Sequence, residues 1–447
     1  MKRLVFSISI IALAITASAQ SRQWTLRQCI DYALEHNITV KQQKNTTESQ
    51  RIQLDDNRGN HLPTLDASIG QNFSFGRGLT AQNTYENTNT SNTGFSLNAS
   101  VPLFMGNKIV NAVKLAQLNL DASLADLEKA KDDIRTQVAK AYVQILYDHE
   151  VSEVAKRQIA IDSMQTFRLQ RMMEAGKASQ AQVSQQRATL AQSRLTATNA
   201  DNNYRLSLLA LSQLLELPTP EGFDIVRPDA SAIIPSVGAD GSVQALPSPD
   251  LVYAEALGIK PQVKAEQLRL SGSDYNIKIA RGDYFPSLSF TAGLGTNYYT
   301  TSGFDADSFG KQLKNNFSQY LGINLSIPIF NHFITRNKIR TAKIDRENQA
   351  LRLENTKKDL YKEIQQVYYN AIAASIRYAS SEEAVRSNED AFELTKAKYE
   401  NGKATMTEFN EQKNNLLKAQ SDMVQAKYEY LYQTSLLDFY RGKALEF

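Results

Sequence analysis

The residue types that most often do chemistry are sparse in this 447-residue chain, and they form no catalytic or metal-binding pattern. Its four histidines are scattered, so none belongs to a His-Glu-x-x-His or Cys/His arrangement of the kind that zinc requires. The chain also lacks a Gly-x-x-x-x-Gly-Lys-Ser/Thr phosphate loop and a Gly-x-Ser-x-Gly nucleophile turn. The sequence therefore predicts neither an enzyme nor a cofactor site. The histidines are His36, His61, His149 and His332.

Two weaker patterns remain, a repeated Gly-Lys pair and several paired carboxylates. Gly176-Lys177 and Gly402-Lys403 are typical of a turn glycine followed by a helix-end lysine. Pairs such as Glu382-Glu383 stand in long polar stretches, where we expect solvation and not acid–base work. Taken from the residues alone, Glu408 and Glu411 are also an ordinary solvated helix face.

The first residues have the pattern of a secretory signal peptide. Lys2 and Arg3 precede a mostly apolar run that is too short to cross a bilayer of about 30 Å as a helix. Ala17-Ser18-Ala19 supplies a cleavage site of small residues. We expect residues 1–19 to be removed and the mature chain to start near Gln20.

The mature composition excludes several classes of protein. Removal of the signal peptide takes away two of the 50 Lys and Arg residues, so the mature chain has 48 basic and 47 acidic residues and a net charge of +1. It has no basic stripe of the kind that binds nucleic acid. The single Cys29 can form no internal disulfide, and its place inside the mature chain implies no lipid anchor. No mature segment has about 18 consecutive apolar residues, which excludes helical membrane spans but leaves β-strands possible.

A tandem duplication organises the chain. Residues 58–65, RGNHLPTL, recur as RGDYFPSL at 281–288, an offset of 223. Residues 101–104, VPLF, recur as IPIF at 327–330, an offset of 226 that also links the two Gly-Lys pairs. Such constant offsets indicate a duplicated unit of about 225 residues. The predicted domains are the signal peptide, a first repeat at 20–217, a proline-rich linker at 218–250 and a second repeat at 251–447.

Long uninterrupted stretches follow in each copy. Residues 103–217 and 329–447 contain no proline, and their only glycines are Gly176 and Gly402 of the Gly-Lys pairs and, near the ends of the stretches, Gly106 and Gly442. Each copy therefore predicts a helix of about 70 residues, a break at the glycine, and a return helix of about 40. At 1.5 Å per residue the longer helix extends about 100 Å.

Seven-residue spacing of apolar side chains predicts that these helices pack as coiled coils. Frequent alanines between the rows fit packing on more than one side, as in a tube wall, whereas a simple two-stranded coiled coil is the commoner alternative. The rows are Val113, Leu120, Leu127, Ile134 and Ala141 in the first copy, and Leu353, Leu360, Val367 and Ala374 in the second.

Before each long helix the period changes from 3.6 to 2, which predicts a pair of strands with one apolar face. The two repeats of one chain have four such strands, which cannot close a barrel, and open edges are not tolerated in lipid. The strands of three chains would therefore make a twelve-stranded membrane barrel. A water-soluble antiparallel sheet with one wet face is the alternative. Residues 80–92 and 301–316 are expected to be polar loops, and residues 223–226 a short strand in the linker. The apolar positions are Leu65, Ala67, Ile69, Phe73, Phe75, Phe95, Leu97, Ala99, Val101 and Leu103, then Leu288, Phe290, Ala292, Leu294, Leu321, Ile323, Leu325, Ile327 and Ile329.

This order of elements resembles the TolC family of outer-membrane efflux proteins over essentially the whole mature chain. The Arg-Gly-x-x-x-Pro-x-Leu, Pro-Leu/Ile-Phe and Gly-Lys motifs carry the resemblance. It implies an α+β membrane protein, in which a coiled-coil α-helical barrel adjoins a transmembrane β-barrel completed by trimerisation, with four strands per duplicated protomer. The family implies a homotrimer in outer-membrane lipid that reaches into the periplasm. A periplasmic adaptor and an inner-membrane pump or ABC transporter are its implied partners.

The resemblance also implies functional residues at the periplasmic tips. The adaptor would dock at Gly176, Lys177, Gly402 and Lys403. By the family pattern the closed aperture would be ringed by Glu408 and Glu411, with Tyr399 beside them. Where that pattern has an arginine this chain has Ala404, and where it has an aspartate this chain has Gln182. At most, a hydrogen bond between Tyr399 of the second repeat and Gln182 of the first is therefore expected.

An exported coiled-coil scaffold is the rival interpretation. The strand pairs and their duplication argue against it, and the proline-free helices argue against an ordinary porin. No residue pattern identifies the cargo.

Overall fold

The computed structural model describes residues 23–79, 83–218, 220–228 and 246–446. Contacts divide the chain into two units, which we describe separately. The predicted signal peptide lies outside the described residues, and the predicted domain boundaries stay predictions. The first unit comprises Met1–Lys44, Asp126–Val263 and Asn355–Phe447, and the second comprises Asn45–Ala125 and Lys264–Glu354.

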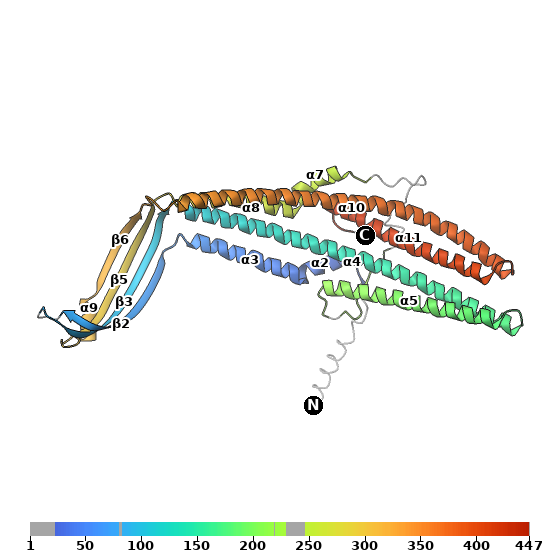
Figure 1. The fold of residues 1–447 in the computed structure, drawn as a ribbon, viewed down its shortest axis with the longest axis horizontal. Coiled ribbons are helices and arrows are strands. Elements are labelled where there is room, and N and C mark those ends of the chain that lie inside the picture. Colours follow the sequence, from blue (N-terminus) through green and yellow to red (C-terminus); the bar gives the residue numbers. More distant parts are fainter. Residues whose placement is uncertain (1–22, 80–82, 219, 229–245, 447) are drawn as a thin grey trace, which may run out of the picture. The chain divides into compact units, whose positions relative to one another are not determined.

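Long helices dominate the chain and match the predicted lengths (Figure 1). In each copy a helix of 67 residues is followed by a turn and a return helix of 35 residues, which confirms the prediction from the missing prolines. The paired helices are α4 (Lys108–Glu174) with α5 (Gln180–Leu214), and α10 (Ile334–Glu400) with α11 (Met406–Tyr440). The shorter helices are α2 (Leu26–His36), α3 (Ile38–Gly59), α7 (Pro249–Ile259) and α8 (Pro261–Gly282).

The core of the first unit draws side chains from several helices at once. Its largest apolar cluster joins Ile134 and Val138 of α4 to Leu211 of α5, Val367 of α10 and Leu437 of α11. Residues of the predicted heptad rows lie in this cluster, so the rows do mark packed seams. Because helices of both copies share the core, the alternative of a simple two-stranded coiled coil is wrong.

A two-residue parallel ladder fastens the start of the described chain. Strand β1 (Gln23–Trp24) pairs with β4 (Asp224–Ile225), the strand expected near residues 223–226. The Trp24 ring packs edge-on against Tyr32 at 5.1 Å and Phe223 at 6.0 Å between centroids. The ladder is too short to be stable alone, so this aromatic packing holds it.

The second unit contains one antiparallel sheet with strand order β2-β3-β5-β6. Strands β2 and β6 have no partner on their outer edges within the described residues. A short helix, α9 (Phe309–Asn315), lies between β5 and β6 in sequence. The strands are β2 (Thr64–Leu79), β3 (Tyr85–Met105), β5 (Ser287–Thr301) and β6 (Ser318–Ser326).

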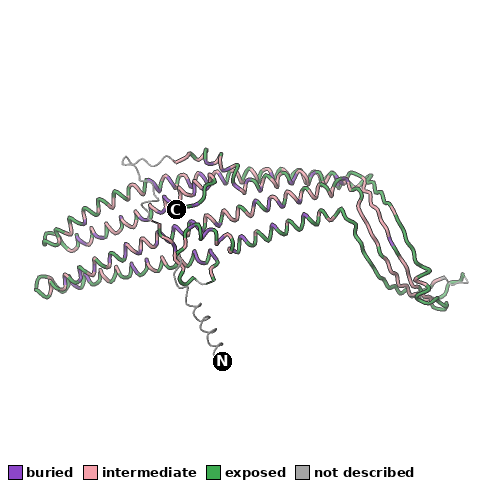
Figure 2. Tube along the Cα trace, turned by 180° about the vertical axis from the view of Figure 1, so that it is seen from behind, coloured by how far each residue is buried: buried purple, intermediate pink, exposed green. Residues whose placement is uncertain are grey.

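The register puts the predicted apolar positions on one face of this sheet. Ala67 stands opposite Leu97, and Leu97 opposite Leu294, so the odd-numbered residues of β2 and β3 share a face with the even-numbered residues of β5. This face is exposed in the single chain, where Ile69 is 74% and Leu321 78% accessible. Figure 2 shows the outer strands as the most exposed part of the sheet.

Three local expectations were wrong. Residues 85–92 extend β3 instead of forming a loop, because they pair in register with residues 72–79 of β2. Residues 327–329 lie outside β6, because β5 begins at Ser287 opposite Ser326 and offers no partner beyond it. The second polar loop contains α9, which packs against β5.

None of the described helices has an apolar stretch long enough to cross a lipid bilayer.

Candidate functional site

The turns between the paired helices lie in the first unit and have the same backbone geometry. Gly176 and Gly402, the predicted turn glycines, both have a φ of 69°, which lies in the left-handed region. After α4 the Lys177 N–H donates to Met172 O at 2.8 Å, and after α10 the Lys403 N–H donates to Lys398 O at 2.8 Å. This is the Schellman arrangement, which satisfies the last carbonyls of each helix.

Lack of room for a side chain is not the reason that glycine occurs at these turns. A Cβ placed on Gly176 or Gly402 would meet no atom within 4 Å. Glycine is required because its backbone enters the left-handed region without steric cost. Lys177 and Lys403 follow as exposed residues, so each turn presents one cation to solvent.

Each return helix begins with a capping box, at positions related by the 226-residue offset. Ser179 Oγ accepts from the Gln182 N–H at 3.2 Å, while Gln182 Oε1 accepts from the Ser179 N–H at 2.8 Å. In the second copy Thr405 Oγ1 accepts from the Glu408 N–H at 3.2 Å, and Glu408 Oε2 accepts from the Thr405 N–H at 2.6 Å. Gln182 and Glu408 therefore make the same N-terminal helix cap, but only the Glu408 side chain is charged.

The charge on Glu408 is favoured by its cap. The Thr405 backbone N–H and then its hydroxyl donate to the carboxylate and hold the pKa of Glu408 below its ordinary value. Glu411 lies one turn further along α11, exposed and without a hydrogen bond or ion pair among the described residues. Spacing of three residues puts both carboxylates on one helix face.

Tyr399 lies in an aromatic cluster beside an arginine that the sequence did not point to. Its ring stacks on Phe409 with 5.0 Å between centroids, and the Arg168 guanidinium lies 5.9 Å from the ring centroid. Arg168, from α4, also forms an ion pair of 3.4 Å with Glu400 at the end of α10. An arginine of the first copy thus lies beside Tyr399, although Ala404 replaces the arginine expected nearby.

The expected Tyr399–Gln182 hydrogen bond does not occur among the described residues of the single chain. Gln182 Oε1 accepts from both the N–H and the hydroxyl of Ser179. The physical reason is local, since a side chain three residues from the cap satisfies an otherwise unpaired helix N–H.

A buried ion pair links the first copy to the second, deeper in the same unit. Lys413 of α11 is 2% exposed and its Nζ lies 2.5 Å from Asp162 Oδ1 of α4, a residue that is fully buried. Asp162 also accepts from Gln158 at 3.1 Å, Ser193 at 2.5 Å and Gln186 at 3.4 Å. The carboxylate is thereby satisfied by donors from α4, α5 and α11, as a buried charge must be.

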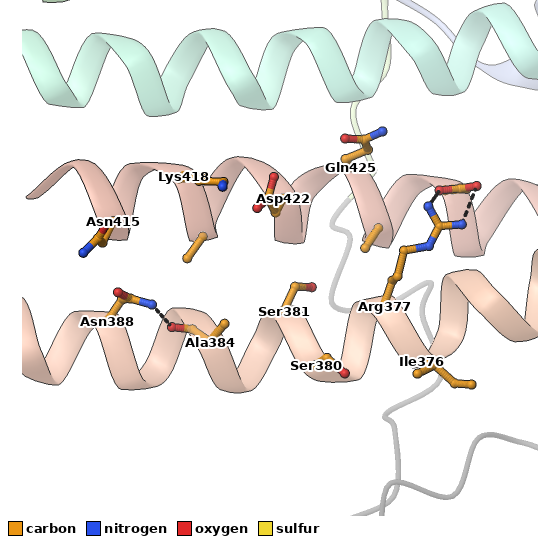
Figure 3. Close-up of a pocket in the computed structure, with 13 residues that line it drawn as sticks. Ile376, Arg377, Ser380, Ser381, Ala384, Asn388, Asn415, Lys418, Asp422 and Gln425 are labelled. Atoms are coloured by element: carbon orange, nitrogen blue, oxygen red, sulfur yellow. Dashed lines mark hydrogen bonds and ion pairs between the residues drawn. The ribbon is translucent and has the colours of Figure 1, made fainter. Parts of the chain in front are cut away.

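A surface groove of about 610 Å³ runs between α10 and α11 (Figure 3). Small residues such as Ser381 and Ala384 line it, and Arg377 pairs with Glu429 at 3.2 Å on its margin. The lining contains no histidine or cysteine and no nucleophile held against a base, so it offers no catalytic arrangement.

Comparison with known proteins identifies the family. A family model described as outer membrane efflux protein matches residues 29–216 and 252–442, one stretch in each repeat. The chain belongs to this family. It is therefore an outer-membrane export channel of the TolC type that extends into the periplasm, a transport protein and not an enzyme.

Relatives and solved structures agree with this assignment. Outer membrane protein OprJ of Pseudomonas aeruginosa is 24% identical over 396 residues, 84% of this chain and 75% of OprJ. "Toxin and drug export protein A" of Aggregatibacter actinomycetemcomitans is 22% identical, over 77% of this chain and 71% of its own length.

Among solved structures, that of CusC has a TM-score of 0.75 at 16% identity, with 96% of this chain and 95% of CusC covered. The CmeC channel of Campylobacter jejuni has a TM-score of 0.75 at 20% identity, covering 94% of this chain and 86% of CmeC. These likenesses confirm the predicted fold, with long coiled coils and four antiparallel strands per duplicated protomer. The matching solved structures also include that of OprN, which like CmeC is an outer-membrane channel.

Proposed function

We propose that three copies of this chain form a passive exit duct whose β-barrel crosses the outer membrane and whose helices line a periplasmic tunnel. The observation that carries the proposal is the four-stranded sheet, whose outer strands β2 and β6 have no further partner among the described residues and whose apolar face is exposed. Open edges are costly in lipid, and closure with the strands of two further copies removes them.

At the periplasmic end we propose that a periplasmic adaptor docks on the turns at Gly176-Lys177 and Gly402-Lys403. The adaptor would belong to an inner-membrane pump or ABC transporter. A duct needs no binding pocket, so the pump selects the cargo. Relatives named for toxin, drug and pyoverdine export fit a duct that serves different pumps.

Glycine at the two turns is open to a test with a matched control. Gly176→Val or Gly402→Val should weaken adaptor cross-linking and export, because a β-branched side chain at this φ costs about 1–2 kcal/mol and reshapes the turn. Gly→Asn at either position should be close to wild type, since asparagine tolerates the left-handed region. Val variants that cross-link and export as well as the Asn variants would refute docking at these turns.

At the aperture we propose that Glu408 and Glu411 of three copies form a ring of six carboxylates, with Tyr399 and Gln182 beside them. Support comes from their shared helix face and from the cap that favours charged Glu408. Such a ring attracts cations, as acidic rings do in cation channels.

Neutralising the ring should lower cation selectivity in planar-bilayer recordings. Glu408→Gln with Glu411→Gln should reduce the permeability ratio of cations to anions severalfold and weaken block by multivalent cations from the periplasmic side. The difference should fade at high salt, because the Debye length falls from about 10 Å at 0.1 M to about 3 Å at 1 M. The cap survives in this variant, since Gln182 already makes the same cap in the first copy.

The matched control removes the same charge elsewhere. Glu382→Gln with Glu383→Gln, an exposed pair on α10, should leave selectivity unchanged. Both variants should remain trimers by native mass in detergent, since solvated charges contribute little to folding. Equal selectivity in the two double variants would mean that Glu408 and Glu411 are a solvated helix face, and a monomer by native mass would overturn the duct itself.

A further inference from the structure

Strand β6 is too short to cover the edge of its neighbour. It pairs only with residues 287–295 of β5, although β5 continues to Thr301. Residues 296–301 of β5 therefore have no strand on that side, at the end of the sheet distant from α8 and α10. In a membrane wall such a row of unpaired backbone groups must find other partners.

Helix α9 and the residue that follows it supply those partners through side-chain amides. The Gln312 carboxamide accepts from the Tyr299 N–H at 2.9 Å and donates to Tyr299 O at 3.0 Å, as a neighbouring strand would do. Asn316, just after the helix, donates to Asn297 O at 2.8 Å. These bonds satisfy backbone groups along the part of β5 that β6 leaves uncovered.

Apolar contacts fix α9 over the same part of the sheet. The Phe309 ring packs edge-on against Tyr298 at 5.3 Å and Phe95 at 6.3 Å between centroids. Phe95 stands opposite Ile69, so α9 overlies the apolar face at the edge of β5. Thr296 also donates its hydroxyl to Leu313 O at 2.7 Å, which makes α9 a built element of the sheet edge and not a loose loop.

Strand β2, at the opposite edge of the sheet, is longer than β6. Strand β2 has 16 residues and β6 has nine, so at least seven residues of β2 can have no β6 partner when copies join edge to edge. Strand β2 begins directly after α3 and β6 ends just before α10, so the two strands are level at the helix end. The surplus is then residues 73–79, at the same end of the sheet as α9.

We propose that α9 continues the barrel wall beyond β6 and contacts residues 73–79 of β2 in a second copy of the chain. This inference rests on the proposed trimer, whose wall would otherwise have a notch between β5 of one copy and β2 of the next. The contact joins the outer side of α9, which carries the exposed Lys311 and Lys314, to a strand edge with free backbone groups.

Thiol cross-linking between copies tests the contact in the full-length protein. Lys314→Cys with Phe75→Cys should give covalent dimers and trimers on denaturing gels after treatment of membranes with a short bismaleimide. Lys314→Cys with Leu65→Cys is the matched control, because Leu65 lies on the same face of β2 at its other end and is as exposed as Phe75, 68% against 75%. The parent should give no cross-link, since Cys29 is fully buried and burial raises the pKa of its thiol to about 12.

A third pair separates this proposal from the trimer itself. Leu325→Cys in β6 with Leu65→Cys in β2 should cross-link wherever copies join edge to edge. If that pair cross-links and Lys314→Cys with Phe75→Cys does not, α9 lies outside the wall and the proposal is wrong while the duct stands. If Lys314→Cys reacts equally with both β2 positions, the predicted contact is also refuted. If no pair cross-links, the edge-to-edge trimer fails with it.

Discussion

Lys413→Met should destabilise the first unit by about 3–5 kcal/mol, a large fraction of the stability of an ordinary domain. The substitution keeps the length of the side chain but leaves the fully buried Asp162 carboxylate without its cation. Its remaining donors, from Gln158, Ser193 and Gln186, are neutral and cannot balance a buried charge. The loss should therefore come from the uncompensated carboxylate more than from the missing bond.

Trp24 makes the measurement direct. It is the only tryptophan of the chain and packs in the same unit, so denaturant unfolding of the detergent-solubilised protein can be followed by its fluorescence. Adding Asp162→Asn to Lys413→Met should recover part of the lost free energy of unfolding, because no buried charge then remains. Lys129→Met, which removes an exposed pair with Asp133 on α4, should change it by less than about 1 kcal/mol.

Two results would contradict this account. A Lys413→Met protein as stable as the Lys129→Met protein would show that the pair is not buried in the assembled channel. A double variant less stable than Lys413→Met alone would show that Asp162 matters through its hydrogen bonds and not through its charge.

The elements of this channel were predictable where one physical rule dominates. The absence of proline between residues 103 and 217 was enough to predict α4 and α5, because only proline and glycine interrupt a helix strongly. Alternation such as that of Leu65, Ala67 and Ile69 was enough to predict the apolar face of the sheet.

Prediction failed where pairing decides structure. Residues 85–92 are polar on both faces, so only their pairing with β2 makes them a strand. Helix α9 has seven residues, too few for a periodic pattern, and forms against the edge of β5.

The candidate site was predictable only as far as the duplication reaches. The offset of 226 residues relates the two turn glycines, and the Ser179-x-x-Gln182 and Thr405-x-x-Glu408 spacing is a capping-box signature that was legible in the sequence. The Lys413–Asp162 pair left no such signal. Its counterparts at the same offset are Arg187 and Asn388, so the duplication does not repeat the pair, and its members are 251 residues apart. Contacts of this kind depend on tertiary packing alone.

The second large effect is expected from a charged substitution on the exposed apolar face of the sheet. Ile323→Arg should strongly reduce the folded channel in the outer membrane, because an arginine facing lipid at mid-depth costs about 2–4 kcal/mol. Ile323 stands in the middle of β6 opposite Phe290 and is 71% exposed in the single chain. The measurement is the amount of heat-resistant trimer in outer-membrane fractions on semi-native gels.

Asn324→Arg is the control, since it adds the same charge to the adjacent residue of the same strand. Asn324 stands opposite Ser289 on the polar face, which would line the lumen, where a charged side chain stays hydrated. Trimer levels should then be close to wild type. Because the two variants differ only in the face that carries the arginine, equal trimer levels would mean that the apolar face does not contact lipid, and a reversed order would mean that the sheet is inserted with its faces exchanged.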